Sequence, residues 1–65
     1  MDEEITLREH EVLQFLASGK TIKEIAELLF IAETTVTTHR EKLKEKLDCK
    51  NTPELTYKAS KLGLI

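Results

Sequence analysis

The sequence predicts an all-α fold: a compact four-helix domain that contains a helix-turn-helix. Three observations support this. Apolar residues recur at spacings of three and four along most of the chain, as on one face of a helix. Two threonines are each followed three positions later by glutamate, the capping-box pattern that starts a helix. The chain of 65 residues is long enough for one core only, so residues 1–65 are expected to form a single domain.

The first helix is expected to begin at Leu7, directly after the capping box of Thr6 and Glu9. It should end near Ser18, because Gly19 readily adopts the left-handed conformation that stops a helix. Its apolar stripe consists of Val12, Leu13 and Leu16.

A second capping box, Thr21 with Glu24, predicts a short helix over residues 22–29. Its inward positions are Ile25, Ala26 and Leu29. Residues 30–32 interrupt the helical period and predict a tight turn.

The third helix is expected over about residues 33–47. Its start is weakly capped, because Ala32 has no side-chain oxygen to offer. Stepping 100° per residue from Val36 places a set of residues inward: Val36, His39, Arg40, Leu43 and Leu47.

The fourth helix is expected to open with Thr52 as its N-cap and Pro53 in its first turn. Gly63 should end this helix. Its inward positions are Leu55, Ala59 and Leu62.

A short helix, a three-residue turn and a longer helix form the outline of a helix-turn-helix, whose second helix enters the major groove of DNA. Short polar side chains occupy the outer face of the third helix in its first half. Hydroxyl groups can donate or accept at base edges, and a glutamate can accept from cytosine N4. The expected base readers are Thr34, Thr37, Thr38 and Glu41.

The net charge of −2 and the pI of about 5.6 argue against nucleic acid as a partner. The acids gather at one end, however, with five acids against one base in residues 1–18. Residues 37–51 hold five bases against three acids. The expected contacts to the DNA backbone are Lys20, Lys23, Thr35, Arg40, Lys42, Lys44, Lys46, Lys50 and Asn51.

Each of these residues also has a purely structural interpretation. Glu41 can pair with Lys44 at helical spacing, and threonine hydroxyls can bond their own backbone. His39, at the edge of the buried face, should pack with a hydrogen bond to the chain, and His10 should lie at the surface.

No combination of residues resembles a metal site, a cofactor site or a catalytic centre, so neither an enzyme nor a bound cofactor is expected. Cys49 is alone and should pack as a small apolar residue. A lone cysteine and the lack of a long apolar run favour a cytoplasmic location with no membrane contact.

The residues also resemble the LuxR-type (NarL/FixJ-type) helix-turn-helix domain over nearly the whole chain. The resemblance rests on the segments Ile5–Glu9, Glu11–Leu13, Gly19, Lys23–Ala26, Leu29, Ile31, Thr35–Val36, His39–Arg40, Lys46–Leu47 and Gly63–Ile65. It implies a DNA-binding effector domain, often attached after a receiver or ligand-sensing domain, that pairs on operator half-sites through its last helix. The residues of that helix implied in dimerisation are Leu55, Tyr57, Lys58 and Ala59.

The sequence departs from this family pattern at several positions. Ile22 stands where the family usually has an asparagine near the DNA backbone, although periodicity alone would bury it. Thr37 replaces a frequent lysine, Ala32 a frequent serine cap, and residues 52–53 a common Arg-Thr pair. These departures predict weaker electrostatic binding and more dependence on dimerisation.

Two other functions remain open from the sequence. One is a promoter-reading module that resembles region four of bacterial sigma factors. The other is a protein-interaction module that has lost DNA binding, which the acidic net charge would favour. RNA polymerase is a candidate partner in addition to an operator in double-stranded DNA.

Overall fold

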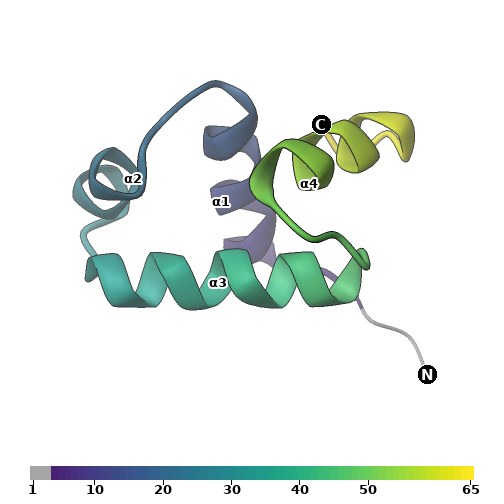
Figure 1. Ribbon diagram of the computed structural model, residues 1–65. Helices are drawn as coiled ribbons and strands as arrows, with labels where there is room; N and C mark the ends of the chain where they lie inside the picture. Colours follow the sequence, from purple (N-terminus) through teal and green to yellow (C-terminus); the bar gives the residue numbers. More distant parts are fainter. Residues whose placement is uncertain (1–3) are drawn as a thin grey trace.

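The two capping boxes start their helices as predicted. The structure is a computed structural model that describes residues 4–65, so Asp2 and Glu3 of the acidic start lie outside the described residues. Within that range the chain forms four helices and no strand (Figure 1). They are α1 (Leu7–Ala17), α2 (Ile22–Leu29), α3 (Glu33–Lys46) and α4 (Thr52–Lys61). The predicted all-α fold is confirmed.

The hydrogen bonds at the starts of α1 and α2 are reciprocal. The Thr6 hydroxyl accepts from the Glu9 amide at 3.1 Å, and the Thr6 amide donates to the Glu9 carboxylate at 3.0 Å. Thr21 and Glu24 repeat this pair of bonds at 3.1 and 2.8 Å. Ala32, at the start of α3, makes no side-chain cap, as expected.

The longest helix, α3, organises the packing. It runs along one side of the molecule, while α1, α2 and α4 all lie on its other side (Figure 1). The buried apolar residues come from all four helices: Val12, Leu13, Ile25, Ala26, Val36, Leu43, Leu55 and Ala59. Within residues 4–65, no helix is both long and apolar enough to span a bilayer.

All four helices end in the same way. Each ends with a residue in the left-handed region, and the next amide donates to the carbonyl five residues before it, at 2.8–3.1 Å. The left-handed residues are Gly19, Phe30, Asp48 and Gly63, with φ of 91°, 58°, 57° and 76°. Glycine and, to a lesser degree, aspartate tolerate this conformation. Phenylalanine tolerates it poorly, so Phe30 adopts the left-handed region at a cost of roughly 1–2 kcal/mol.

The cap of α4 differs from the prediction. The residue before the helix is Asn51, whose side-chain oxygen accepts from the Glu54 amide at 2.8 Å, and Thr52 is the first helical residue. The Glu54 carboxylate in turn accepts from the Lys50 amide at 2.9 Å. Asparagine and threonine both cap helices well, so the sequence alone did not distinguish them.

Two further expectations about burial are wrong. Leu62 was expected to point inward but is 57% exposed, because α4 ends at Lys61 and the chain reverses at Gly63. Leu64 then packs against the core in its place. His10 was expected at the surface, but it is half-buried and its Nε2 donates to the Leu64 carbonyl at 2.7 Å.

Replacing Asn51 with alanine is expected to lower the free energy of unfolding by about 1 kcal/mol, because the Glu54 amide loses its cap. Thr52→Ala is the matched control and should change it by less than about 0.5 kcal/mol. Urea denaturation followed by circular dichroism measures both. A larger loss for Thr52→Ala than for Asn51→Ala would contradict the assigned cap.

Candidate nucleic-acid interface

One side of α3 faces away from the other three helices (Figure 1). Val36 and Leu43 point to the core, whereas the opposite side of the helix faces away from α1, α2 and α4 (Figure 1). The exposed residues on α3 are Glu33, Thr34, Thr35, Thr38, Glu41, Lys42 and Glu45. The free side is therefore a ridge of short polar and charged side chains, accessible along its length.

The structure places the four predicted base readers unequally on this ridge. Thr34 and Thr38 are exposed, and the Glu41 side chain is 49% exposed, but Thr37 is partly buried. The Thr38 hydroxyl donates to the Thr34 carbonyl at 3.0 Å. This local bond leaves the Thr38 oxygen free to accept a hydrogen bond from a base.

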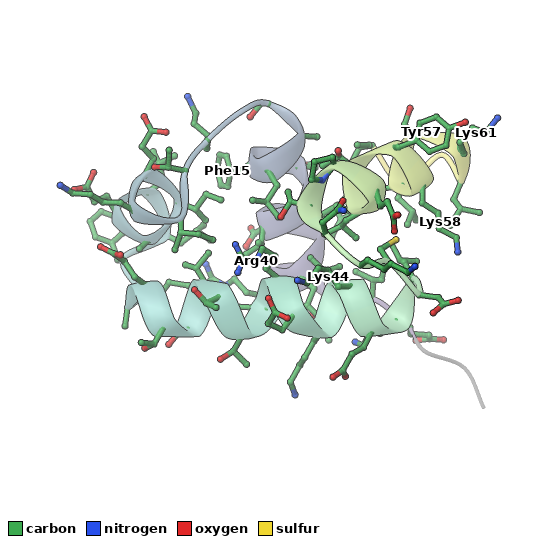
Figure 2. All side chains as sticks on the ribbon, in the orientation of Figure 1. Phe15, Arg40, Lys44, Tyr57, Lys58 and Lys61 are labelled. Atoms are coloured by element: carbon green, nitrogen blue, oxygen red, sulfur yellow. The ribbon has the colours of Figure 1, made fainter. Side chains whose placement is uncertain are left out.

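Glu41 is held in ion pairs by two basic residues of its own helix. Its carboxylate lies 3.1 Å from Lys44 Nζ and 3.2 Å from the Arg40 guanidinium. The hydrogen bond from Lys44, together with the one from Arg40, lowers the pKa of Glu41 even though partial desolvation opposes this. The predicted pairing of Glu41 with Lys44 is confirmed. Arg40 and Lys44 lie on the side of α3 that faces the other helices, rather than on the free ridge (Figure 2).

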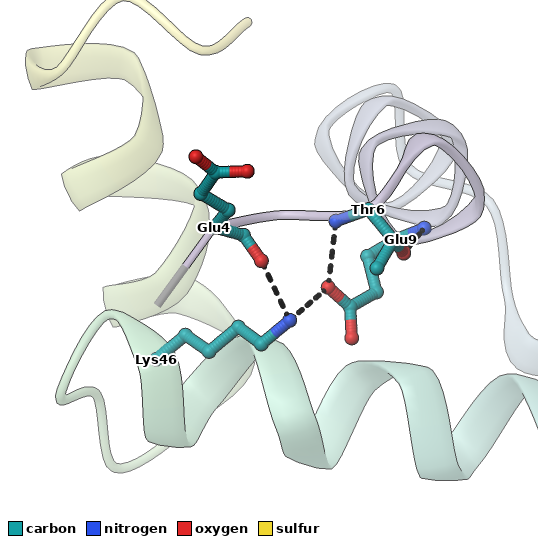
Figure 3. Close-up of polar contacts among 4 residues, drawn as sticks. All are labelled: Glu4, Thr6, Glu9 and Lys46. Atoms are coloured by element: carbon teal, nitrogen blue, oxygen red, sulfur yellow. Dashed lines mark hydrogen bonds and ion pairs between the residues drawn. The ribbon is translucent and has the colours of Figure 1, made fainter. Parts of the chain in front are cut away.

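Lys46 was expected to contact DNA phosphates, but in the structure its ammonium group is engaged within the domain. Its Nζ donates to the Glu9 carboxylate at 2.6 Å and to the Glu4 carbonyl at 2.8 Å (Figure 3). The Lys46 side chain is only 18% exposed and that of Glu9 only 3%. The helical wheel placed Lys46 at the surface because it cannot show that the start of α1 passes the end of α3.

Glu9 keeps its charge despite its burial. Desolvation would raise the pKa of its carboxyl group, but the hydrogen bond from Lys46 and the one from the Thr6 amide outweigh it and lower the pKa. The same oxygen accepts from both donors (Figure 3). The sequence revealed the capping role of Glu9 but gave no signal for its long-range partner.

The other predicted contacts to the DNA backbone differ in whether their side chains are free to bind a phosphate. Exposed residues available to phosphates are Lys20, Lys23, Thr35, Lys42 and Lys50. Asn51 is exposed, but its side-chain oxygen already caps α4. Ile22, at the family's asparagine position, is partly buried and packs against the core, as periodicity predicted.

His39 was expected to make a hydrogen bond to the chain, but its Nδ1 makes none within residues 4–65. Its Nδ1 is buried, as is the Nε of Arg40, and neither has a partner within residues 4–65. Over the same residues, no three histidine, cysteine or acidic side chains gather as metal ligands would. Cys49 is half-buried against the core, as predicted.

The outer surface of α4 is smaller than the resemblance implied. Leu55 and Ala59, two of the four residues implied in dimerisation, are fully buried in the core of this domain. Tyr57 is 66% exposed, and Lys61 Nζ lies 5.7 Å from the centre of its ring (Figure 2). A groove beside Tyr57 is lined by Asp48, Cys49, Glu54, Lys58, Lys61 and Leu62. Lys61 and Leu62 of this groove are not among the residues that the resemblance implied.

Comparison with known protein families identifies this fold. The family described as "Bacterial regulatory proteins, luxR family" matches residues 3–59. The chain belongs to the luxR family. This match also decides between the LuxR-type and sigma-like interpretations, in favour of the former. The luxR-family domain is the DNA-binding helix-turn-helix of transcriptional regulators, so this chain is a DNA-binding domain of a transcription regulator.

Relatives in the luxR family come from several kinds of regulator. The chain is 44% identical over 63 residues to "Uncharacterized response regulatory protein YgeK" of Escherichia coli K12, covering 97% of this chain and 43% of that protein. It is 44% identical over 61 residues to the "HTH-type quorum sensing-dependent transcriptional regulator VjbR" of Brucella abortus, covering 94% of this chain and 24% of that protein. The chain therefore spans less than half the length of these relatives.

A solved structure supports the same assignment. The crystal structure of the phage VqmA-DPO complex superposes with a TM-score of 0.90 at 33% identity. The superposition covers 98% of this chain and 29% of that one.

Replacing Glu9 with glutamine is expected to lower the free energy of unfolding at pH 7 by roughly 1–3 kcal/mol, because Lys46 loses its charged partner. A carboxyl group with a lowered pKa stabilises the fold above its ordinary value of 4.5, and that stability is lost as the pH falls through the folded-state pKa. The wild type should therefore lose stability below about pH 4.5 more steeply than Glu9→Gln.

Thermal unfolding between pH 7 and pH 3 measures this difference. Glu11→Gln is the control in the same helix, because the pair that Glu11 forms with Arg8 at 3.5 Å is solvent-exposed. Parallel pH curves for the wild type and Glu9→Gln would show that the buried pair does not govern acid stability.

Proposed function

We propose that this domain reads an operator with the N-terminal half of α3 in the major groove of duplex DNA. The observation that carries the proposal is the free side of α3, where short polar side chains allow close approach to base edges. Thr34 and Thr38 contact the bases, since both are exposed threonines in the first half of the helix. Thr35 is exposed as well and is assigned to the phosphate backbone. Glu41 accepts from cytosine N4 when it exchanges its own ion pairs for the base. Thr37 makes the more peripheral contact, with its methyl group.

The exposed lysines hold the domain on the phosphate backbone. Lys20 and Lys23 flank the start of α2, where free backbone amides also attract anions. Lys42 and Lys50, with the Thr35 hydroxyl, extend this contact along α3 and beyond it. Arg40 and Lys44 can turn to the phosphates when their ion pairs with Glu41 break and Glu41 binds a base. Asn51 contacts a phosphate through its side-chain amide nitrogen, because its oxygen caps α4.

Two copies of the chain pair through α4 on adjacent half-sites. Tyr57, Lys58, Lys61 and Leu62 offer the exposed part of that contact, and Tyr57 supplies its aromatic anchor. Because the relatives are more than twice as long, we infer that the domain is the effector part of a larger cytoplasmic response regulator or ligand-sensing regulator. Such a regulator acts on transcription through RNA polymerase. No catalytic activity is proposed.

Selection of bound sequences from a randomised duplex pool tests the proposal directly. A recovered consensus with two related half-sites is the expected result. Failure to bind any duplex at low salt, even when two copies are covalently joined, would show that the domain has lost DNA binding.

Lys42 and Lys46 are expected to respond in opposite ways to the same substitution. Each phosphate contact contributes about −0.9 to the slope of log affinity against log salt. Lys42→Met should remove about 0.9 from that slope per domain, with stability changed by less than about 0.5 kcal/mol. Lys46→Met should leave the slope unchanged but lower stability by roughly 2–4 kcal/mol, because Glu9 is left buried and unpaired.

Fluorescence anisotropy at several salt concentrations gives the slopes, and urea denaturation gives the stabilities. An unchanged slope for Lys42→Met would remove Lys42 from the interface. A reduced slope for a folded Lys46→Met would return Lys46 to it.

Tyr57→Glu is expected to weaken binding to a duplex with two half-sites by roughly tenfold or more, since it places a charge in the centre of the contact. Binding to a single half-site should stay the same. Leu7→Glu is the control, because Leu7 is 80% exposed on α1. Sedimentation of the complexes measures their stoichiometry. Unimpaired two-site binding by Tyr57→Glu would place the dimer contact elsewhere.

A further inference from the structure

Phe30 is the exception among the four helix ends. The left-handed positions that follow α1, α3 and α4 are filled by glycine, aspartate and glycine, which adopt this conformation at little cost. Phe30, with φ 58° and ψ 44°, occupies the equivalent position after α2. A bulky residue in this region is a true outlier, so the turn itself does not account for a phenylalanine here.

Packing within the domain does not account for it either. Phe30 is 93% exposed, the highest value among the large apolar residues of the described chain. Its neighbour Ile31 packs against the core and makes the apolar contact that usually accompanies such a helix end. The ring therefore gains nothing in the isolated domain from either conformation or burial.

The place of Phe30 in the fold indicates what the ring contacts. It opens the turn between the two helices of the helix-turn-helix, and Ala32, Glu33 and Thr34 after it are all exposed. Four peptide units separate Phe30 from Thr34, so their Cα atoms lie within about 15 Å of each other. When the start of α3 enters the major groove, this turn lies beside the groove.

We propose that Phe30 is a DNA-contacting residue, whose ring packs against the thymine methyl group or the sugar carbons beside the bases read by α3. Phenylalanine is one of the side chains that make apolar contact with the thymine methyl group. A single exposed ring is large enough to contact one nucleotide. It is too small to form a protein interface, which needs about 800 Å² from each partner. This inference rests on the proposed DNA binding.

Two substitutions separate DNA contact from folding. Phe30→Gly and Phe30→Asn both suit the left-handed conformation, so neither should destabilise the fold, and Phe30→Gly should raise the melting temperature by up to about 4–8 °C. Both should weaken operator binding by roughly tenfold, the ratio expected when much of a phenylalanine side chain is no longer buried. Phe30→Tyr, which keeps the ring, should bind within about twofold of the wild type.

The salt dependence distinguishes this contact from a phosphate contact. Phe30 carries no charge, so affinity should fall at every salt concentration while the slope of log affinity against log salt stays the same. Leu28→Gln is the matched control: it removes an exposed apolar side chain two positions earlier in the chain and should leave affinity unchanged.

Wild-type affinity in both Phe30→Gly and Phe30→Asn would overturn the proposal. Loss of transcriptional output with unchanged DNA affinity would also overturn it, because the ring would then contact a protein. A wild-type domain that binds no duplex is a different result, which refutes the proposed function itself.

Discussion

A buried contact joins α3 to α1: Lys46, at the end of α3, pairs with Glu9, in the first turn of α1. Burying two charges is costly unless both are paired and hydrogen-bonded. Here one carboxylate oxygen accepts from Lys46 and from the Thr6 amide, and Lys46 also holds the Glu4 carbonyl. The contact therefore fixes three things at once: the start of α1, the end of α3 and the path of the chain before them.

Local signals predicted most of the fold correctly. Capping boxes, glycines and helical spacing depend on residues a few positions apart, so Thr6, Thr21 and Gly19 could be assigned without knowing the packing. Long-range contacts gave no such signal. Lys46 meets Glu9 across 37 positions and His10 meets Leu64 across 54, and neither pair shows in any local pattern.

In the candidate site, too, local features were predicted correctly and long-range contacts were not. The free ridge of α3 followed from the helical wheel, which correctly separated Thr34 and Thr38 from Val36 and Leu43. The wheel could not show that Lys46 was already engaged, because that depends on where α1 presents the Glu9 carboxylate. Phe30 was predicted as part of a turn, but its exposure and left-handed conformation became visible only in three dimensions.

The two sides of α3 separate stability from recognition. One side packs with the other three helices, and the other is free of them. Substitutions on the free side leave the core unchanged, so new operator preferences can accumulate without loss of folding. A domain of this construction is well suited to diversification after gene duplication, and to the laboratory redesign of its target sequence on a constant scaffold.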